Sequence, residues 1–105
     1  MPKKPESRLQ RRIKEALRRE FPQSFFVKIW GGLFQVKGLP DLIGCIGPYF
    51  VAVEVKMPDG KLTMYQNAMI SAINDIGAIA IVAHSPEEAV DLIKSRLTSI
   101  RNSKA

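Results

Sequence analysis

The chain has 105 residues, of which 46% are hydrophobic and 25% are charged, and its net charge is +6. This length suits one small domain, spanning residues 1–105, and the hydrophobic share excludes an intrinsically disordered chain. The apolar runs are too short to span a membrane, and no signal-peptide apolar region follows the basic start, so we expect a cytoplasmic protein. The one cysteine, Cys45, cannot form an internal disulfide.

Charge is distributed unevenly along the chain. Residues 1–28 carry nine Lys and Arg against three Glu, residues 29–93 carry three against seven acids, and residues 94–105 carry four and no acid. Basic flanks suit contacts with phosphates, and an acidic centre suits a carboxylate cluster that binds metal. Many proteins that bind no nucleic acid are also basic, so charge alone does not decide the function.

The first predicted element is a helix over residues 6–21, because its apolar residues recur at helical spacing. Glu6 falls on the apolar side of this helix and faces inward, and it either complements the helix dipole or serves a site. Glu20 lies near the same side at the far end and is the alternative. The basic side chains can contact a phosphate backbone or remain solvated; the candidates are Arg8, Arg11 and Arg12.

Residues 24–30 are predicted to form the first strand, since Pro22 ends the helix and a β-rich run follows. Trp30 closes that run beside two glycines. An exposed tryptophan here could stack on a base or wedge a junction, but a position in the core or in a dimer interface is the favoured interpretation.

The centre of the chain, residues 38–56, reads GLPDLIGCIGPYFVAVEVK and predicts an antiparallel hairpin. Its strands, 42–46 and 49–55, flank a Gly-Pro turn. If Ile46 faces Tyr49, the register places Asp41 directly across from Glu54 on one face of the hairpin. Gly38, just before Pro40-Asp41, would allow a close backbone approach.

Two opposed carboxylates define a candidate metal site. Opposed residues in a hairpin have Cβ atoms about 4.5–5.5 Å apart, so Asp41 and Glu54 can bind one divalent cation between them. Without a cation they would repel each other, and a buried like-charge pair is a functional-site candidate. Lys56 points the same way as Glu54 and offers a charge that can polarise a nucleophile or stabilise an oxyanion.

The second half predicts a helix, a strand and a helix. Thr63 to Gly77 forms the first helix, in which Thr63 and Gln66 match a capping box, and residues 78–83 form a buried strand parallel to a neighbour across the crossover. The last helix begins after Ser85 and runs to about Ser99. We expect flexible ends at 1–5 and at about 101–105.

The string PD, a spacer and ExK resembles the active-site signature of the PD-(D/E)XK nuclease superfamily. Within that superfamily, GLPDLIG, VAVEVK and LTMYQ are most similar to the stand-alone virus-type replication-repair nuclease domain (VRR-NUC), and the match runs from about Glu6 to Val82. The resemblance implies an α/β fold with a restriction-endonuclease-like αβββαβ core, a mixed sheet of about four strands flanked by helices. The hydrophobic pattern predicts the same layering independently.

The resemblance also implies a mechanism, the hydrolysis of phosphodiester bonds in DNA with Mg²⁺ or Mn²⁺. Asp41, Glu54 and the backbone carbonyl of Val55 would hold the ion, and Lys56 would orient or deprotonate a water. Glu6 and Gln66 would line the active site, although the capping box is another role for Gln66. Hard oxygen ligands without a Cys/His cluster argue against zinc. Basic residues expected to contact nucleic acid are Arg8, Arg11, Arg12, Lys37 and Lys61.

Stand-alone members of this family are similar to homodimeric, structure-selective endonucleases of phages and prophages and resemble Holliday-junction resolvases. The resemblance therefore implies a homodimer that cuts junction or flap DNA in a bacterial host cell during replication, recombination or repair, without a small-molecule cofactor or a membrane. Apolar residues such as Phe25, Phe34 and Trp30 offer surface for a dimer. A non-catalytic DNA-binding module and an RNA-directed nuclease of the same fold remain open alternatives. A structural or assembly protein explains less.

Overall fold

The computed structural model describes residues 5–31 and 36–103 of the chain. In chain order its elements are α1 (Pro5–Glu20), β1 (Ser24–Lys28), β2 (Leu42–Ile46), β3 (Tyr49–Val55), α2 (Met64–Asp75), β4 (Ile79–Ala83) and α3 (Pro86–Ser103). The predicted order of elements and the α/β class are confirmed. Phe34, which the sequence offers as a dimer-surface residue, lies outside the described residues.

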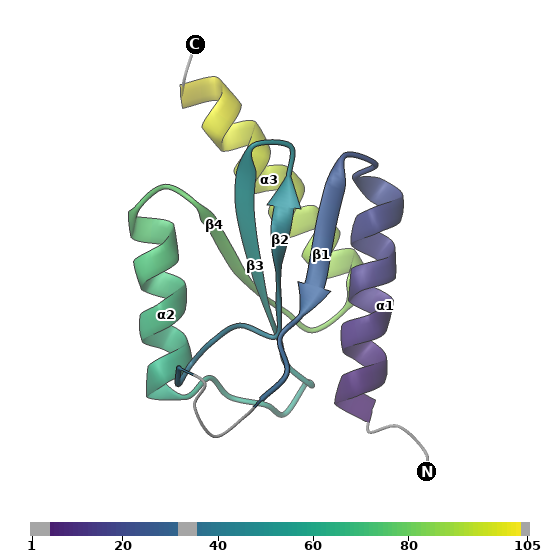
Figure 1. Ribbon diagram of the computed structural model, residues 1–105, viewed down its shortest axis with the longest axis vertical. Helices are drawn as coiled ribbons and strands as arrows, with labels where there is room; N and C mark the ends of the chain where they lie inside the picture. The colour runs from purple at the N-terminus through teal and green to yellow at the C-terminus, as the bar shows by residue number, and fades with distance from the viewer. Residues whose placement is uncertain (1–4, 32–35, 104–105) are drawn as a thin grey trace.

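The strands form one mixed sheet in the order β1-β2-β3-β4 (Figure 1). β1 and β3 both pair antiparallel with β2, whereas β3 and β4 pair in parallel. The parallel pair follows from the crossover through α2, and the antiparallel pairs from the hairpin. The predicted mixed sheet flanked by helices is therefore correct.

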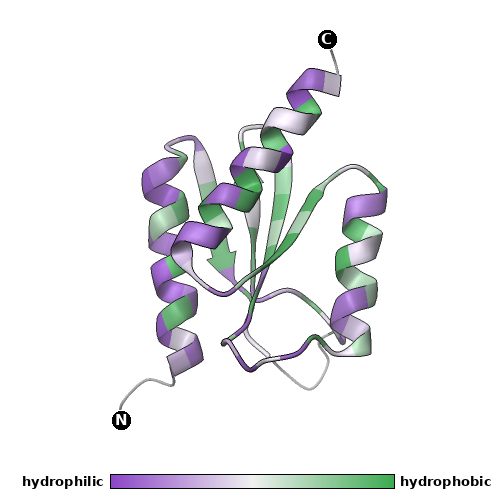
Figure 2. Cartoon of the chain, turned by 180° about the vertical axis from the view of Figure 1, so that it is seen from behind, coloured by the Kyte–Doolittle hydropathy of each residue, from purple (hydrophilic) through white to green (hydrophobic). Residues whose placement is uncertain are grey.

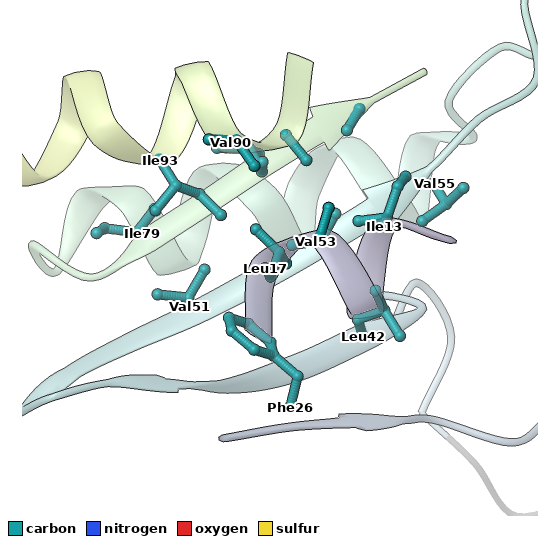
Figure 3. Close-up of a cluster of buried hydrophobic side chains, with 14 of the residues drawn as sticks. Ile13, Leu17, Phe26, Leu42, Val51, Val53, Val55, Ile79, Val90 and Ile93 are labelled. Atoms are coloured by element: carbon teal, nitrogen blue, oxygen red, sulfur yellow. The ribbon is translucent and has the colours of Figure 1, made fainter. Parts of the chain in front are cut away.

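One face of the sheet carries the hydrophobic core. Val51, Val53 and Val55 alternate along β3 and are fully buried against Ile13 and Leu17 of α1 and against α3 (Figure 3). Figure 2 shows the same division, with hydrophobic residues concentrated in the strands and hydrophilic residues on the outer sides of the helices. Burying an aliphatic side chain of this size contributes about 1.5–3 kcal/mol, so this face supplies most of the driving force for folding.

The other face is covered by α2, which has no buried residue. The predicted helix and its capping box are present, and Gly77 follows the helix with a φ of +93°. Its apolar stripe does not enter a core, since Tyr65 is 50% and Ile76 83% exposed. Periodicity gives a helix its apolar side but does not say whether another element covers that side.

Polar contacts hold the far end of α2 in place instead. The Asn74 side chain accepts a hydrogen bond from Ala80 N (2.9 Å) and donates one to Ala80 O (3.0 Å). Arg96 of α3 donates to Asn74 Oδ1 (2.7 Å) and to the Ala78 carbonyl (3.0 Å). These bonds join α2, β4 and α3 without apolar burial.

Several predicted boundaries shift. β1 ends at Lys28, so Trp30 lies beyond the strand. With 75% of its surface exposed, Trp30 is not in the core, and the dimer interface, its other expected position, stays a prediction. α1 already includes Pro5, and α3 continues to Ser103, past the predicted end near Ser99, with Ile100 packed against the core. Among the residues that can be described, no helix combines the length and the apolarity needed to cross a bilayer.

Candidate active site

The hairpin register brings the two predicted carboxylates together. Ile46 pairs with Tyr49 and Leu42 pairs with Val53, so the next pair along the hairpin is Asp41 with Glu54, as predicted. Asp41 is fixed by hydrogen bonds at two points. Its backbone carbonyl accepts from Ile29 N (2.8 Å), and its carboxylate oxygen Oδ2 accepts from Val55 N (2.8 Å).

Glu54 is a buried carboxyl group with an unused oxygen. It is only 2% exposed, and its Oε2 atom is buried without a hydrogen-bond partner. Burial raises the pKa of Glu54 to about 9, and a hydrogen bond and the negative charge of Asp41 add to the rise, while the positive charge of Lys56 opposes it. The free protein therefore holds a proton at this pair at neutral pH.

Gln66 completes the predicted capping box and also contacts the carboxylate pair. Its backbone N–H donates to Thr63 Oγ1 (3.1 Å) and its amide oxygen accepts from Thr63 N (2.9 Å), which completes the capping box. Its amide nitrogen donates to Glu54 Oε1 at 3.2 Å. The start of α2 thus fixes a side chain that in turn orients Glu54.

Gly38 explains how the loop before Asp41 meets the start of α2. Its φ is +85°, and a Cβ atom at this position would overlap the backbone carbonyl of Tyr65 and approach Gln66 N at 3.0 Å. The close approach expected of this glycine is therefore made against the helix backbone. Lys37, its neighbour, places its ammonium group 5.0 Å from the centre of the Tyr65 ring.

The two glutamates of α1 lie at opposite ends of the helix. Glu6 is in the first turn, and its charge contributes to the raised pKa of Glu54, so Glu6 lies within electrostatic range of the carboxylate pair. Its side chain is exposed, which differs from the inward-facing position that the helical spacing predicts. Glu20 is in the last turn, 3.6 Å from Lys94 Nζ, and is not part of this group.

The sequence-based interpretation missed Gln10. This side chain is only 6% exposed, and its amide nitrogen lies 3.5 Å from Glu6 Oε1. The available signal was a polar residue four positions after Glu6 on the apolar side of the helix, next to Leu9 and Ile13.

The candidate nucleic-acid contacts are at the surface. Arg8, Arg11 and Arg12 are exposed on α1, and Lys61 is exposed before α2. In Figure 1, α1 and α2 both begin at the end of the sheet where β3 ends. Helix N-termini carry partial positive charge, so this end of the molecule favours an anion such as a phosphate.

The carboxylate pair fits a divalent cation. Asp41 and Glu54 offer hard oxygen ligands, and the unpartnered Glu54 Oε2 is an acceptor that a cation would satisfy. The residue between Glu54 and Lys56 is Val55, whose carbonyl is the third predicted ligand. Within residues 5–31 and 36–103, no three or more His, Cys, Asp or Glu side chains group to hold a metal, so water would have to complete the shell.

The fold and the PD…ExK arrangement together have the architecture of the restriction-endonuclease-like, PD-(D/E)XK-type nucleases. More specifically, the chain is similar to a solved VRR_NUC domain, with a TM-score of 0.64, 25% sequence identity, and coverage of 85% of this chain and 94% of that one. The resemblance inferred from the sequence is thereby confirmed.

A second solved structure, the Holliday junction resolvase Hjc of Archaeoglobus fulgidus, matches with a TM-score of 0.56 at 22% identity. That match covers 73% of this chain and 65% of the resolvase, and at this identity it shows a shared fold only. No protein-family model and no curated protein matches the sequence.

Proposed function

We propose that the chain is a metal-dependent DNA endonuclease. The observation that carries this proposal is the pairing of half-buried Asp41 with buried Glu54, in which one carboxyl oxygen of Glu54 has no partner and the pKa of Glu54 is raised to about 9. A like-charge pair that is taken out of water lowers stability, so its presence indicates a function. Binding a cation is the function that these ligands suit.

Asp41, Glu54 and the carbonyl of Val55 would hold Mg²⁺ or Mn²⁺. When bound, such an ion lowers the pKa of water and offsets the charge that builds on a phosphate. Asp41 is already oriented for this role by the Val55 N–H group, and Glu54 by the Gln66 amide. The chain therefore contributes a preorganised carboxylate pair that needs little rearrangement.

Lys56 would orient the attacking water or the scissile phosphate. It follows Glu54 by two residues, and its positive charge opposes the rise in the pKa of Glu54, which supports a role beside the carboxylate pair. Glu6 would join the site from α1 through a bound water. Phosphates of the flanking strand would lie against the helix N-termini and against the predicted basic residues, which are Arg8, Arg11, Arg12, Lys37 and Lys61.

Branched DNA is the proposed substrate, and a homodimer the proposed active form. The similar Hjc protein is a Holliday junction resolvase, and the basic first helix beside a small site suits a substrate that spans more than one duplex arm. Phe25 is exposed on the sheet face that α2 leaves uncovered, which gives apolar surface for a second copy.

The test is cleavage of an end-labelled four-way junction, a flap and a plain duplex with Mg²⁺ or Mn²⁺, and of an RNA version of each. Glu54→Gln and Lys56→Ala should each lower the rate by about 10²–10³-fold or more, since each removes a group that stabilises charge in the transition state. Glu87→Gln, which alters an exposed glutamate of α3, is the matched control and should cut at the normal rate.

Each other result of this gel has a definite meaning. Binding of the junction without cutting in either metal would favour a DNA-binding module over a nuclease. Cutting of the RNA forms alone would make the chain an RNA-directed nuclease. Normal cutting by Lys56→Ala would remove that lysine from the mechanism.

A further inference from the structure

A groove lies between α1 and the edge strand β1. Its volume is about 630 Å³, and the residues that line it include Gln10, Arg11, Lys14, Lys28, Trp30 and Leu42. Leu42 directly follows Asp41 and pairs with Lys28, so the groove adjoins the strand that presents the carboxylate. Ligand sites for small molecules measure about 300–1,000 Å³, which makes this groove large enough for one nucleotide.

Trp30 gives the groove an exposed aromatic wall. The side chain is 75% exposed, and Lys28 Nζ lies 4.2 Å from the ring centroid. A large aromatic ring is seldom left in water unless it meets a partner, and bases stack on such rings regardless of sequence. The ammonium of Lys28 adds a positive charge where a phosphate next to the stacked base would lie.

The charge of the groove has one sign. Arg11, Lys14 and Lys28 line it, and no acidic residue does so within the described part of the chain. Arg11 also lies 4.0 Å from Glu15, but both side chains are more than half exposed, so this ion pair is weak and leaves Arg11 able to bind a phosphate.

Gln10 supplies an independent sign of a missing ligand. The side chain is 6% exposed and lines the groove, yet its Oε1 atom is buried without a hydrogen-bond partner. Leaving a buried acceptor unpaired is unfavourable. The edge of a nucleobase carries N–H groups that can donate to this oxygen, whereas an apolar partner would leave it unsatisfied.

We propose that this groove binds one unpaired nucleotide of the substrate strand. The base stacks on Trp30, its edge donates to Gln10, and the adjoining phosphates contact Arg11, Lys14 and Lys28. A base inside a duplex is stacked on both sides and cannot enter, so the groove selects DNA with a single-stranded segment or an open branch point. The position of this nucleotide next to the cut rests on the proposed nuclease function, whereas its binding needs no metal.

The chain carries its own reporter, because Trp30 is the only tryptophan in the sequence. The experiment titrates the full chain, in EDTA, with single-stranded oligothymidylate and with a blunt duplex of equal length. The single strand should quench the tryptophan emission to saturation, and the duplex should bind without comparable quenching. Lys14→Ala and Gln10→Leu should each weaken the single-strand affinity by at least fivefold, whereas Arg18→Ala, on the same helix outside the groove, should change it less than twofold.

The stacking step is tested with a dye-labelled oligothymidylate and fluorescence anisotropy. Trp30→Ala should weaken binding by at least fivefold, and Trp30→Phe, which keeps an aromatic ring, should restore most of it. Circular dichroism spectra that match the parent chain show that each variant is folded.

Three results would overturn the groove proposal. The first is that single-stranded DNA does not quench the tryptophan emission. The second is that Lys14→Ala and Arg18→Ala weaken single-strand binding equally. The third is quenching that increases with protein concentration in the absence of DNA, which would show that a second copy of the chain occupies the groove. The proposed function fails separately. Saturable quenching with no cleavage overturns the nuclease alone, and cleavage without quenching overturns the groove alone.

Discussion

The two faces of the sheet have different roles, and the single strand β3 contributes side chains to both. In β3, Val53 and Val55 face α1 and α3 and are fully buried among apolar side chains, whereas Glu54 between them faces α2 and is buried beside Asp41 and Gln66. Adjacent residues of one strand thus serve stability and chemistry in turn. The apolar face offsets the cost of burying a carboxyl pair on the other.

The helices reflect the same division. α1 contributes fully buried Ile13 and Leu17 to the core, while α2 has no buried residue and is held by the Gln66–Glu54 hydrogen bond at one end and by the Asn74 contacts at the other. Hydrogen bonds fix direction more strictly than apolar contact does. A helix attached in this way can aim Gln66 at Glu54 without contributing much to the free energy of unfolding.

The largest predicted effect on stability comes from a substitution in the apolar core between the sheet and α1. Leu17→Ala removes a fully buried side chain and should lower the free energy of unfolding by about 2–5 kcal/mol, as measured by urea denaturation. At a temperature where the variant is folded, its cleavage rate should stay within about twofold of the parent rate, because Leu17 lies on the opposite face from the carboxylate pair.

The matched control for Leu17→Ala is Ile76→Ala, which truncates an 83% exposed residue at the end of α2. That change should cost less than about 0.5 kcal/mol. Equal losses for the two variants would show that the exposed side of α2 is buried in solution against something that the single chain does not provide.

The next effect concerns the dependence of stability on pH in EDTA. Because the pKa of Glu54 in the folded chain is raised from 4.5 to about 9, the folded state binds one more proton than the unfolded state across that interval. The contribution of the Glu54 proton to the free energy of unfolding is fully present below pH 4.5 and is lost as pH rises through 9. The free energy of unfolding falls by up to about 1.4 kcal/mol per pH unit in this interval. Glu54→Gln should remove the slope.

Urea midpoints from pH 5 to pH 8 for the parent and for Glu54→Gln measure this difference. The variant should gain on the parent steadily as pH rises, since all other titrating groups are common to both chains. Parallel profiles would mean that Glu54 is ionised in the folded protein, and the account of its burial and of the Asp41 hydrogen bond would be wrong.

The sequence predicted the local part of the site well. The Gly47-Pro48 turn fixes the hairpin register by counting alone, so the pairing of Asp41 with Glu54 followed from the chain. The capping box of Thr63 and Gln66 is also a local pattern and was found. What neither pattern could show is that Gln66 bonds Thr63 and Glu54 at once, because that requires the distance between α2 and β3.

Long-range packing accounts for the errors. The sequence predicts a core or dimer-interface position for Trp30 because the predicted strand extends to residue 30, whereas β1 ends at Lys28 and Trp30 is exposed in the single chain. Gln10 was overlooked as one polar residue within an apolar pattern. Its importance arises only where α1 meets β1, two elements whose contact no short motif encodes.

The smallest predicted effect on stability concerns the capping box at the start of α2, on the sheet face that carries Glu54. Thr63→Ala removes the acceptor for Gln66 N and should lower the free energy of unfolding by about 1 kcal/mol, while Thr63→Ser keeps the hydroxyl and most of the stability. The cleavage rate should fall only a few-fold, because Gln66 still accepts from Thr63 N and donates to Glu54.

Gln66→Ala separates the two roles of that side chain when compared with Thr63→Ala in the same cleavage assay. It removes one half of the capping box and the bond to Glu54 together, so its rate should fall well below that of Thr63→Ala at similar stability. If both variants cut equally slowly, the amide would act only through the helix start. A deeper loss for Gln66→Ala would mean that the sheet face carrying Glu54 needs this hydrogen bond for its chemistry, although the fold does not.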